Sequence, residues 1–352
     1  MTTNSSLQAN FIPSPYIPVA GTYNGLFYEN DEVQRHTSGY FTIRVTPRGT
    51  YSGRLQTAMS RYSFRGVLGL DCRDTNFVSR KFYDPLRLEL NFGSGDDIDQ
   101  VAGSAGDTNW TATLIGDRAV FDKRYNPSPY AGNYTLVLPG QAGDPFLPAG
   151  DGYGTVRVTT AGQTTFTGWL GDGTRVIQRT TVSKNGQWPL HSALRYRAAR
   201  GALLGWMSFA NRPNDDLYGR LSWIKPPILV DRFYQLGLNT ELEAVGSIFT
   251  KPVNGQTDYV LNLTAANVEF SGGNLISDFS NSIQFGPSSR ISNLSANQLK
   301  LSFSTKLGTF TGSVMDPATL KTFKIRGAVL QKQNAGFGLL IGTNQTSRVL
   351  IK

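Results

Sequence analysis

The segment that decides the fold class is Gly154–Leu170, with the sequence GTVRVTTAGQTTFTGWL. Val156 and Val158 alternate with polar residues, and Ala161-Gly162 interrupts the pattern before residues 166–170, FTGWL. Alternation with a period of two is typical of a half-buried strand, and small residues between two such runs indicate a turn. We therefore predict a β-hairpin over residues 154–170.

Similar hairpins recur along the chain. They are found over residues 42–55 and 301–314, with a looser copy over residues 261–272. The strand pattern of residues 62–68 is repeated at residues 323–329, and each copy follows its hairpin after a short gap. The order of the strands is therefore repeated as well as their composition. This pattern indicates an internal duplication of an antiparallel meander, with a period of roughly 100 to 150 residues.

The rest of the composition also favours strands. The 352 residues include 38 glycines and 17 prolines but only six glutamates, and no window shows the apolar stripe of an amphipathic helix. Turn signals recur about every 8 to 12 residues, as in antiparallel sandwiches and barrels. We predict an all-β protein of tandem antiparallel meanders, which form β-barrel or barrel-like sandwich units with internal repeats.

Three glycines of the repeated hairpins, Gly53, Gly168 and Gly312, fall on the apolar face of their strands. A glycine inside a strand costs about 0.5–1 kcal/mol relative to alanine, so these positions need a reason. Such glycines serve a bulge, a barrel corner or the close packing of an aromatic ring over the backbone. We predict that the sheet curls at these positions.

Proline- and glycine-rich junctions divide the chain. Residues 1–20 are predicted to form a linker or extended arm, residues 21–130 the first β-barrel-like unit and residues 131–227 the second. Residues 228–352 are assigned to a third unit, although the second and third units could form one domain. Residues 228–245, the least strand-like segment, are compatible with a short helical turn.

The formal net charge of +9 has two interpretations. It could attract a polyanionic partner, or it could keep a β-rich protein soluble and protect sheet edges from pairing. The sequence has no run of five like charges and no specific nucleic-acid signature. Cys72 is the only cysteine, so neither an intrachain disulfide nor a multi-cysteine metal site is possible. The N-terminus lacks the pattern of a signal peptide, and no apolar run has the length of a transmembrane helix.

Catalytic signals are weak. His36 and His191 are the only histidines, and no nucleophile elbow, phosphate-binding loop or dinucleotide motif is present. A glycan-active hydrolase could work with two loop carboxylates instead. The alternative role of these residues is turn formation. The candidate carboxylates are Asp96, Asp97, Asp99, Asp151, Asp172, Asp215 and Asp216.

The glycine-rich loop that contains Asp96, Asp97 and Asp99 could also bind a hard cation such as Ca²⁺. The loop lacks the spacing of an EF-hand and the downstream glutamate. It is therefore a candidate metal site only, and the same residues could simply form a turn.

Aromatic and basic residues give the stronger binding candidates. Trp169 is out of phase with Phe166 and Leu170, so it points to the polar face, as a sugar-stacking platform or as a cover for a neighbouring unit. Residues 195–200 form the densest basic and aromatic cluster of the sequence. Arg195, Tyr196 and Arg197 in that cluster could contact a phosphate or sulfate backbone. The other interpretation is a solvated hairpin end.

Several motifs together resemble a known but poorly characterised module. They include residues 148–156, PAGDGYGTV, residues 183–190, SKNGQWPL, and residues 330–338, LQKQNAGFG, with further matches at residues 204–206, 221–226 and 342–345. The chain resembles a repeat β-module found at the C-terminus of large exported proteins of environmental bacteria. This resemblance implies a secreted or cell-surface setting and other domains of a larger parent chain as neighbours. It carries no catalytic residues.

These features favour a non-enzymatic extracellular binding or structural module, with a glycan or cell-surface polymer as its partner. Two alternatives remain at this point. One is the glycan-active hydrolase with loop carboxylates. The other is a carrier of small apolar ligands inside a barrel lumen.

Overall fold

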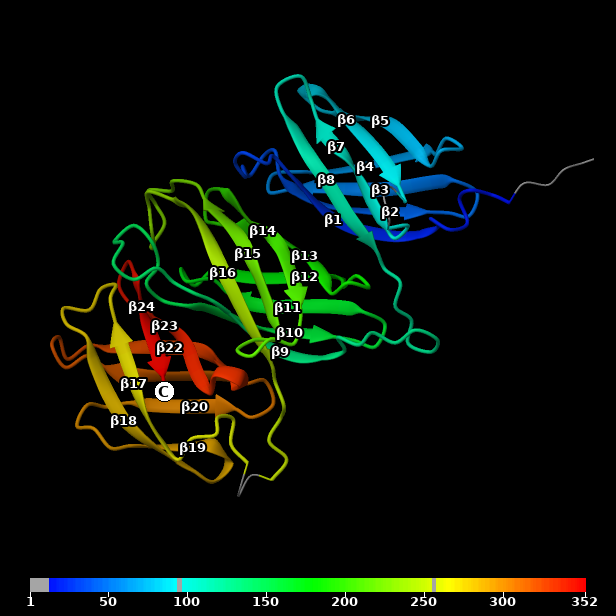
Figure 1. The fold of residues 1–352 in the computed structure, drawn as a ribbon. Coiled ribbons are helices and arrows are strands. Elements are labelled where there is room, and N and C mark those ends of the chain that lie inside the picture. The colour runs from blue at the N-terminus through cyan, green and yellow to red at the C-terminus, as the bar shows by residue number, and fades with distance from the viewer. Residues whose placement is uncertain (1–12, 94–96, 255–257) are drawn as a thin grey trace, which may run out of the picture.

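The computed structural model describes residues 13–93, 97–254 and 258–352. These residues form 24 strands and two short 3₁₀ turns, and the strands form three antiparallel sheets of eight strands each (Figure 1). The predicted fold class of tandem β-barrel-like units is therefore confirmed. No helix in the described ranges has the length and apolar character needed to span a membrane.

The first sheet forms the first barrel and has the strand order β4-β3-β2-β1-β8-β7-β6-β5. All its neighbours pair antiparallel, and hairpins connect most of them. Its strands are β1 (Gly21–Tyr28), β2 (Gly39–Val45), β3 (Thr50–Thr57), β4 (Arg61–Val67), β5 (Arg73–Arg80), β6 (Tyr83–Phe92), β7 (Gln100–Gly106) and β8 (Thr111–Arg118).

The second barrel repeats this order as β12-β11-β10-β9-β16-β15-β14-β13. The hairpin predicted over residues 154–170 is formed by its strands β10 and β11, whose register pairs Val156 with Phe166. The strands are β9 (Gly132–Leu138), β10 (Gly152–Val158), β11 (Gln163–Trp169), β12 (Arg175–Thr181), β13 (Gln187–Arg195), β14 (Arg200–Phe209), β15 (Leu217–Lys225) and β16 (Leu238–Ile248).

The third barrel has a different order, β19-β18-β17-β24-β23-β22-β21-β20. The β17/β24 pairing divides this sheet into three strands (β17–β19) and five (β20–β24), whereas the β1/β8 and β9/β16 pairings divide the first two sheets into four and four. Its strands are β17 (Ala265–Ser271), β18 (Phe279–Gly286), β19 (Arg290–Asn293), β20 (Lys300–Ser304), β21 (Thr309–Met315), β22 (Thr322–Leu330), β23 (Ala335–Ile341) and β24 (Thr346–Ile351), with 3₁₀ turns at Pro287–Ser289 and Gln331–Gln333.

The different strand order of the third barrel decides which hairpins of similar sequence are structurally equivalent. The hairpins over residues 42–55 and 154–170 occupy the same place in the first two barrels, β2–β3 and β10–β11. The hairpin over residues 301–314 is instead β20–β21, which lies at an edge of the third sheet. The sequence likeness of the third copy is therefore local, because similar hairpins occupy different positions around the barrels.

The segment 228–245 contains no helix. Residues 228–237 form turns and loop, and the rest belongs to β16, which completes the second barrel, so that this sheet extends to Ile248, beyond the boundary at residue 227 that the sequence suggests. Leu238, Leu242 and Ala244 are buried, and Glu241 and Glu243 point outward to Arg220. Residues 238–245 alternate between buried and outward-facing positions, as a strand does. The charged residues at the outward positions made this alternation harder to recognise in the sequence.

Each barrel remains open at one seam, the line along which its two edge strands meet without ladder hydrogen bonds. The seams lie between β4 and β5, β12 and β13, and β19 and β20. Large side chains fill the interiors, including Trp188, Trp223 and Phe166 in the second barrel. Side-chain packing of this kind in the second barrel does not favour the carrier alternative, which requires an open lumen.

The glycines of the hairpins lie where an aromatic ring or a neighbouring backbone approaches closely. A Cβ at Gly53 would lie 2.4 Å from the Phe64 ring, and one at Gly168 would lie 2.7 Å from the Phe166 ring. At Gly312 the close neighbour is a backbone oxygen, the Lys300 carbonyl at 2.0 Å. Close approach therefore explains all three positions.

The second barrel lies between the first and the third (Figure 1). Its junction with the third barrel combines an apolar cluster, in which Tyr153 and half-buried Trp169 pack against Ala328 and Leu339, with ion pairs such as that of Asp151 and Arg348. Its junction with the first barrel includes a hydrogen bond from Asn24 Nδ2 to Thr181 Oγ1 of 2.8 Å. The junction with the first barrel contains the candidate site.

Candidate anion-binding cleft between the first two barrels

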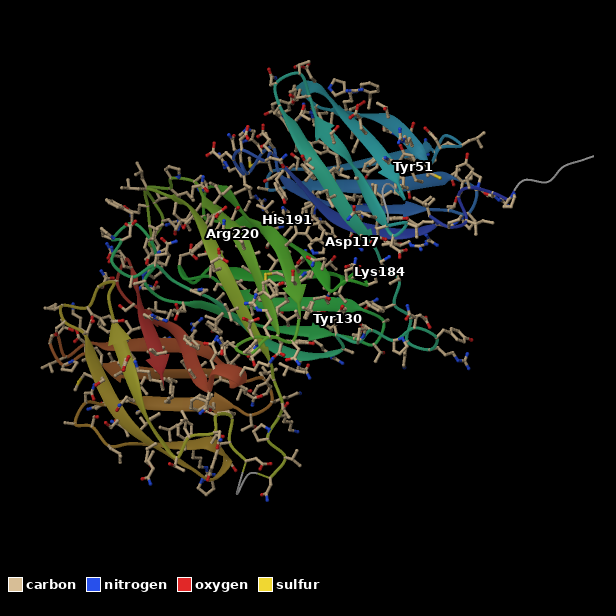
Figure 2. The ribbon with its side chains drawn as sticks, in the orientation of Figure 1. Tyr51, Asp117, Tyr130, Lys184, His191 and Arg220 are labelled. Atoms are coloured by element: carbon tan, nitrogen blue, oxygen red, sulfur yellow. The ribbon has the colours of Figure 1, made fainter. Side chains whose placement is uncertain are left out.

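A cleft of about 600 Å³ lies between the first and second barrels. The first barrel contributes the ends of β2, β3 and β4, and the second contributes β12, β13 and the start of β14. Since β12 and β13 border the seam of the second barrel, the cleft covers this seam. Figure 2 shows His191, one of the residues that line the cleft, on the side of the second barrel that faces the first.

Four arginines give the cleft its charge. Arg61 comes from the first barrel, and Arg179, Arg195 and Arg200 come from the second. All four are exposed, and within the described ranges none of them forms an ion pair and no acidic residue lines the cleft. An arginine fork matches the oxygens of a carboxylate, sulfate or phosphate, so the cleft offers several unpaired donors to an anion.

His191 lies in the cleft wall and stacks on Tyr40 of the first barrel, with ring centroids 6.3 Å apart. Its Nε2 atom is buried and has no hydrogen-bond partner among the described residues. Burial, and to a smaller extent the charge of Arg61, lowers the pKa of His191 to about 4. The imidazole is therefore neutral at neutral pH, and it adds no positive charge to that of the arginines.

The Tyr40 hydroxyl fixes this wall in place. It donates to Asn24 Oδ1 of its own barrel at 2.5 Å and lies 3.0 Å from Thr180 Oγ1 of β12. Burial raises the pKa of Tyr40 to about 12, although the hydrogen bond with Thr180 acts in the opposite direction. The tyrosine therefore remains a neutral hydrogen-bonding link between the two barrels.

Gln178 closes the seam beneath the cleft. Its Nε2 donates to the carbonyl of Pro189 at 2.8 Å, and its Oε1 accepts from Trp188 Nε1 at 3.0 Å. One side chain of β12 thus supplies two hydrogen bonds to β13, where the ladder is missing. Asn76 has the same role at the seam of the first barrel, because its Nδ2 donates to the carbonyl of Arg65 at 2.8 Å.

The carboxylates of the predicted metal loop bind a cation of the protein itself. Lys184 Nζ of the second barrel lies 2.7 Å from Asp97 Oδ1 and 2.8 Å from Asp99 Oδ2, and Arg118 also pairs with Asp99. The hydrogen bond from Lys184 lowers the pKa of Asp97. Burial raises the pKa of Asp99, but bonds from Lys184 and Arg118 outweigh it and leave this pKa lowered.

Asp96 lies outside the described residues. Among the residues that are described, no group of three or more histidine, cysteine or acidic side chains is placed to hold a metal ion. The loop around Asp97 and Asp99 therefore serves as an electrostatic contact between the first two barrels.

Trp169 lies away from the cleft, at the junction between the second and third barrels. It stacks on Tyr153 with ring centroids 5.3 Å apart and packs against the apolar cluster of that junction. This is the position described by the second interpretation of the sequence, an aromatic that covers a neighbouring unit.

The basic and aromatic cluster of β13 is divided by the structure. Arg195 lines the cleft, whereas Arg197 points to the loop after β15 and donates to the carbonyl of Val230 at 3.4 Å. Tyr196 packs against the core of the second barrel, and its hydroxyl accepts from Trp223 Nε1 at 3.0 Å. Only Arg195 of the three is therefore part of the cleft.

The remaining loop carboxylates that were candidates for hydrolysis are all paired with cations. Asp151 contacts Arg348, Asp172 contacts Lys225, Asp215 contacts Arg212 and Asp216 contacts Lys332. A retaining or inverting hydrolase needs two carboxyl groups that face each other across a substrate site. These ion pairs assign the carboxylates to structural contacts instead.

A second hollow, of about 550 Å³, lies on the outer face of the first barrel. Arg44, Arg54 and Arg65 line it from β2, β3 and β4, with Ser52 and Ser63 between them. It is formed by one face of a single sheet, and none of the described residues that line it has a buried polar side-chain atom without a partner. This arginine-lined surface therefore provides the control site for variants of the cleft.

Sequence reasoning identified Arg195, and the predicted cluster at residues 195–200 also contains Arg200, but Arg61 and Arg179 were missed. Arg61 and Arg179 occupy β4 and β12, the corresponding edge strands of the first two barrels. Outward-facing arginines on corresponding edge strands were the available signal. Their proximity depends on the docking of the two barrels, which no sequence pattern encodes.

No protein-family model matches the chain, and no curated protein matches it. Among solved structures, transferrin-binding protein B of Haemophilus parasuis Hp5, in a double-mutant form, has a TM-score of 0.23 and 9% sequence identity, over 94% of this chain and 74% of that chain. The isotype 1 transferrin-binding protein B of serogroup B Neisseria meningitidis has a TM-score of 0.21 and 11% identity, over 94% and 75% of the two chains.

Proposed function

We propose that this protein is a non-enzymatic extracellular binding module that binds an acidic glycan of the cell surface or its surroundings in the cleft between the first two barrels. The observation that carries the proposal is the set of four exposed arginines, Arg61, Arg179, Arg195 and Arg200, which converge on one cleft without acidic partners in the described ranges.

The other residues that line the cleft indicate which class of anionic ligand fits it. Besides the arginines, the cleft is lined by the polar side chains of Gln56, Ser60 and Ser192 and by the apolar side chains of Met59 and Ile177. A chain of sugars that carries sulfate or carboxylate groups matches this mixture, because its hydroxyls need hydrogen bonds and its ring faces need apolar contact. Its anionic groups would pair with the arginine forks.

A nucleic acid would also present anionic groups. Binding of single strands without sequence preference depends on aromatic side chains on which successive bases stack. Tyr40 is the aromatic ring in the cleft besides His191, and it is already stacked on that histidine. The walls therefore favour a glycan over a nucleic acid.

Retention on immobilised polymers tests this proposal. We expect the protein to bind a sulfated or uronate polysaccharide, to pass through a neutral polysaccharide of similar length, and to elute as salt screens the contacts. The double variant Arg179→Gln/Arg195→Gln should lose retention, and the matched variant Arg44→Gln/Arg54→Gln on the outer face of the first barrel should keep it.

Three results would overturn the proposal. Equal retention on the neutral polymer would remove the role of charge. Loss of retention in the outer-face variant alone would place the site on that face. Preference for single-stranded DNA over every polysaccharide would change the ligand class.

A further inference from the structure

A buried ion pair lies at one end of the second barrel, outside the cleft. Lys225 is the last residue of β15, and Asp172 lies in the turn between β11 and β12. Each side chain is 1% exposed, and Lys225 Nζ is 3.5 Å from Asp172 Oδ2. The pair joins the two halves of the sheet that meet at the β12/β13 seam.

A second carboxylate contacts the same amine. Asp231 Oδ2 lies 2.8 Å from Lys225 Nζ, and the carbonyl of Phe233 accepts a hydrogen bond from it at 2.6 Å. The ring of Tyr196 covers the amine, with its centroid 4.7 Å from Nζ, and Trp223 fixes that ring through the tyrosine hydroxyl. The amine is thus enclosed by two carboxylates, a backbone carbonyl and the ring of Tyr196.

The two oxygens of Asp172 have different surroundings. Oδ1 accepts a hydrogen bond from the backbone N–H of Thr174 at 2.8 Å. Oδ2 is buried and has no hydrogen-bond partner among the described residues, although it is the oxygen nearest to the amine. Burial raises the pKa of Asp172, despite the opposing charge of Lys225. Burial without a hydrogen bond favours the neutral form of this carboxyl group, and an amine attacks a neutral carboxyl group more readily than a carboxylate.

We propose that Lys225 and Asp172 condense to an intramolecular isopeptide bond, with Asp231 as the group that moves the proton. Proton transfer within the ion pair gives a neutral amine and a neutral carboxyl. The lone pair of Nζ attacks Cγ of Asp172 and forms the C–N bond. Asp231 takes a proton from the nitrogen and passes it to the departing hydroxyl, so that the C–O bond breaks and one water leaves.

Each part of this arrangement favours condensation over hydrolysis. The barrel holds the nitrogen and the carboxyl group in contact, which replaces the entropy cost of a bimolecular step. The surrounding side chains exclude the water that would reverse the reaction. Asp231, with its side chain 22% exposed, can act as general base and then as general acid.

The bond would stabilise the second barrel against opening at its seam. The β12/β13 seam lacks ladder hydrogen bonds, and a covalent link from the β11–β12 turn to the end of β15 connects the sheet on both sides of it. Such a link restricts the unfolded chain in the same way as a disulfide. The isopeptide bond would stabilise the folded state in a chain whose single cysteine cannot form an intrachain disulfide.

Intact mass of the folded wild-type chain, measured after transfer to denaturant, tests the proposal, and circular dichroism checks that the variants fold. The purified chain should be lighter than its sequence mass by one water. Trypsin should release residues 158–175 joined to residues 221–232, the two peptides that contain Asp172 and Lys225. The variants Lys225→Met and Asp231→Asn should both have their full sequence masses and give no joined peptide.

The alternatives give different masses. A wild-type chain of full mass after prolonged incubation would overturn the proposal and leave a simple ion pair. A water deficit that persists in Lys225→Met would also overturn it, because it would indicate a succinimide at an Asp-Gly step, Asp172-Gly173 or Asp151-Gly152, which forms without the lysine.

Discussion

His191 shows how the environment of one residue sets its protonation. The imidazole is buried beside Arg61, so the folded state binds a proton only below a pKa of about 4, whereas an unfolded chain binds it near 6.5. Between these values the unfolded state binds more protons, and the stability contributed by the neutral histidine is lost as the pH falls.

The variant His191→Phe tests this assignment. The ring should retain its stacking on Tyr40 and remove a buried nitrogen without a partner, so we expect little change in melting temperature at pH 7.5. At pH 4.5 the variant should be more stable than the wild type by on the order of 2 kcal/mol.

The comparison with wild type is necessary because other groups act in the opposite direction. Burial raises the pKa of Asp117 and of Asp151 to about 6, so these carboxyls favour the folded state as the pH falls through this range. The wild type and the His191→Phe variant both contain these carboxyl groups, so their effect cancels in the comparison. A melting difference that does not depend on pH would contradict the assignment of His191.

Trp169 is assigned to the junction between the second and third barrels rather than to a ligand. Replacement by alanine removes its stacking on Tyr153 and its contacts with Leu339, so we expect a loss of roughly 2–3 kcal/mol in unfolding free energy. Thermal unfolding should show this loss, and the exposed control Phe77→Ala should not. Unchanged stability together with lost glycan retention would instead support a sugar platform.

At the scale of the strands, the seams are the weak elements of the barrels. Gln178→Leu would remove both hydrogen bonds that cross the β12/β13 seam and leave the Pro189 carbonyl and the Trp188 indole N–H buried without partners. We expect a cost of about 2–4 kcal/mol and faster hydrogen exchange in β12 and β13.

Asn76→Leu is the matched change at the seam of the first barrel, where Asn76 bonds the carbonyl of Arg65. Its effect on exchange should be confined to β4 and β5. If hydrogen exchange stays unchanged at both seams, the edge strands are held together without the side chains of Gln178 and Asn76.

At the scale of the whole molecule, docking of the first barrel depends on charge. Lys184→Met removes the contacts with Asp97 and Asp99, so we expect faster proteolysis of the connection 119–131 between the barrels. The partly exposed pairs contribute at most about 1 kcal/mol, and added salt should weaken the wild type in the same direction. Proteolysis that is insensitive to both changes would assign the docking to the Tyr40 network alone.

The sequence predicted the features that depend on local pattern. Alternation identified the hairpin of Val156 and Phe166, and the apolar-face glycines Gly53 and Gly168 were recognised as positions of close approach or curling. The cleft could not be predicted, because Arg61 and Arg179 belong to different barrels. The contact between Lys184 and Asp97 has the same origin. Pairing within a sheet follows from residue order, whereas docking between barrels follows from surface shape.

The central claim is that the arginines of the cleft, rather than net charge, bind an acidic glycan. Calorimetric titration with a sulfated polysaccharide at one ionic strength measures this directly. We predict that Arg179→Gln/Arg195→Gln weakens binding at least about tenfold, or 1.4 kcal/mol, and that Arg44→Gln/Arg54→Gln, with the same change in charge, weakens it far less. Equal losses in the two variants would contradict the account.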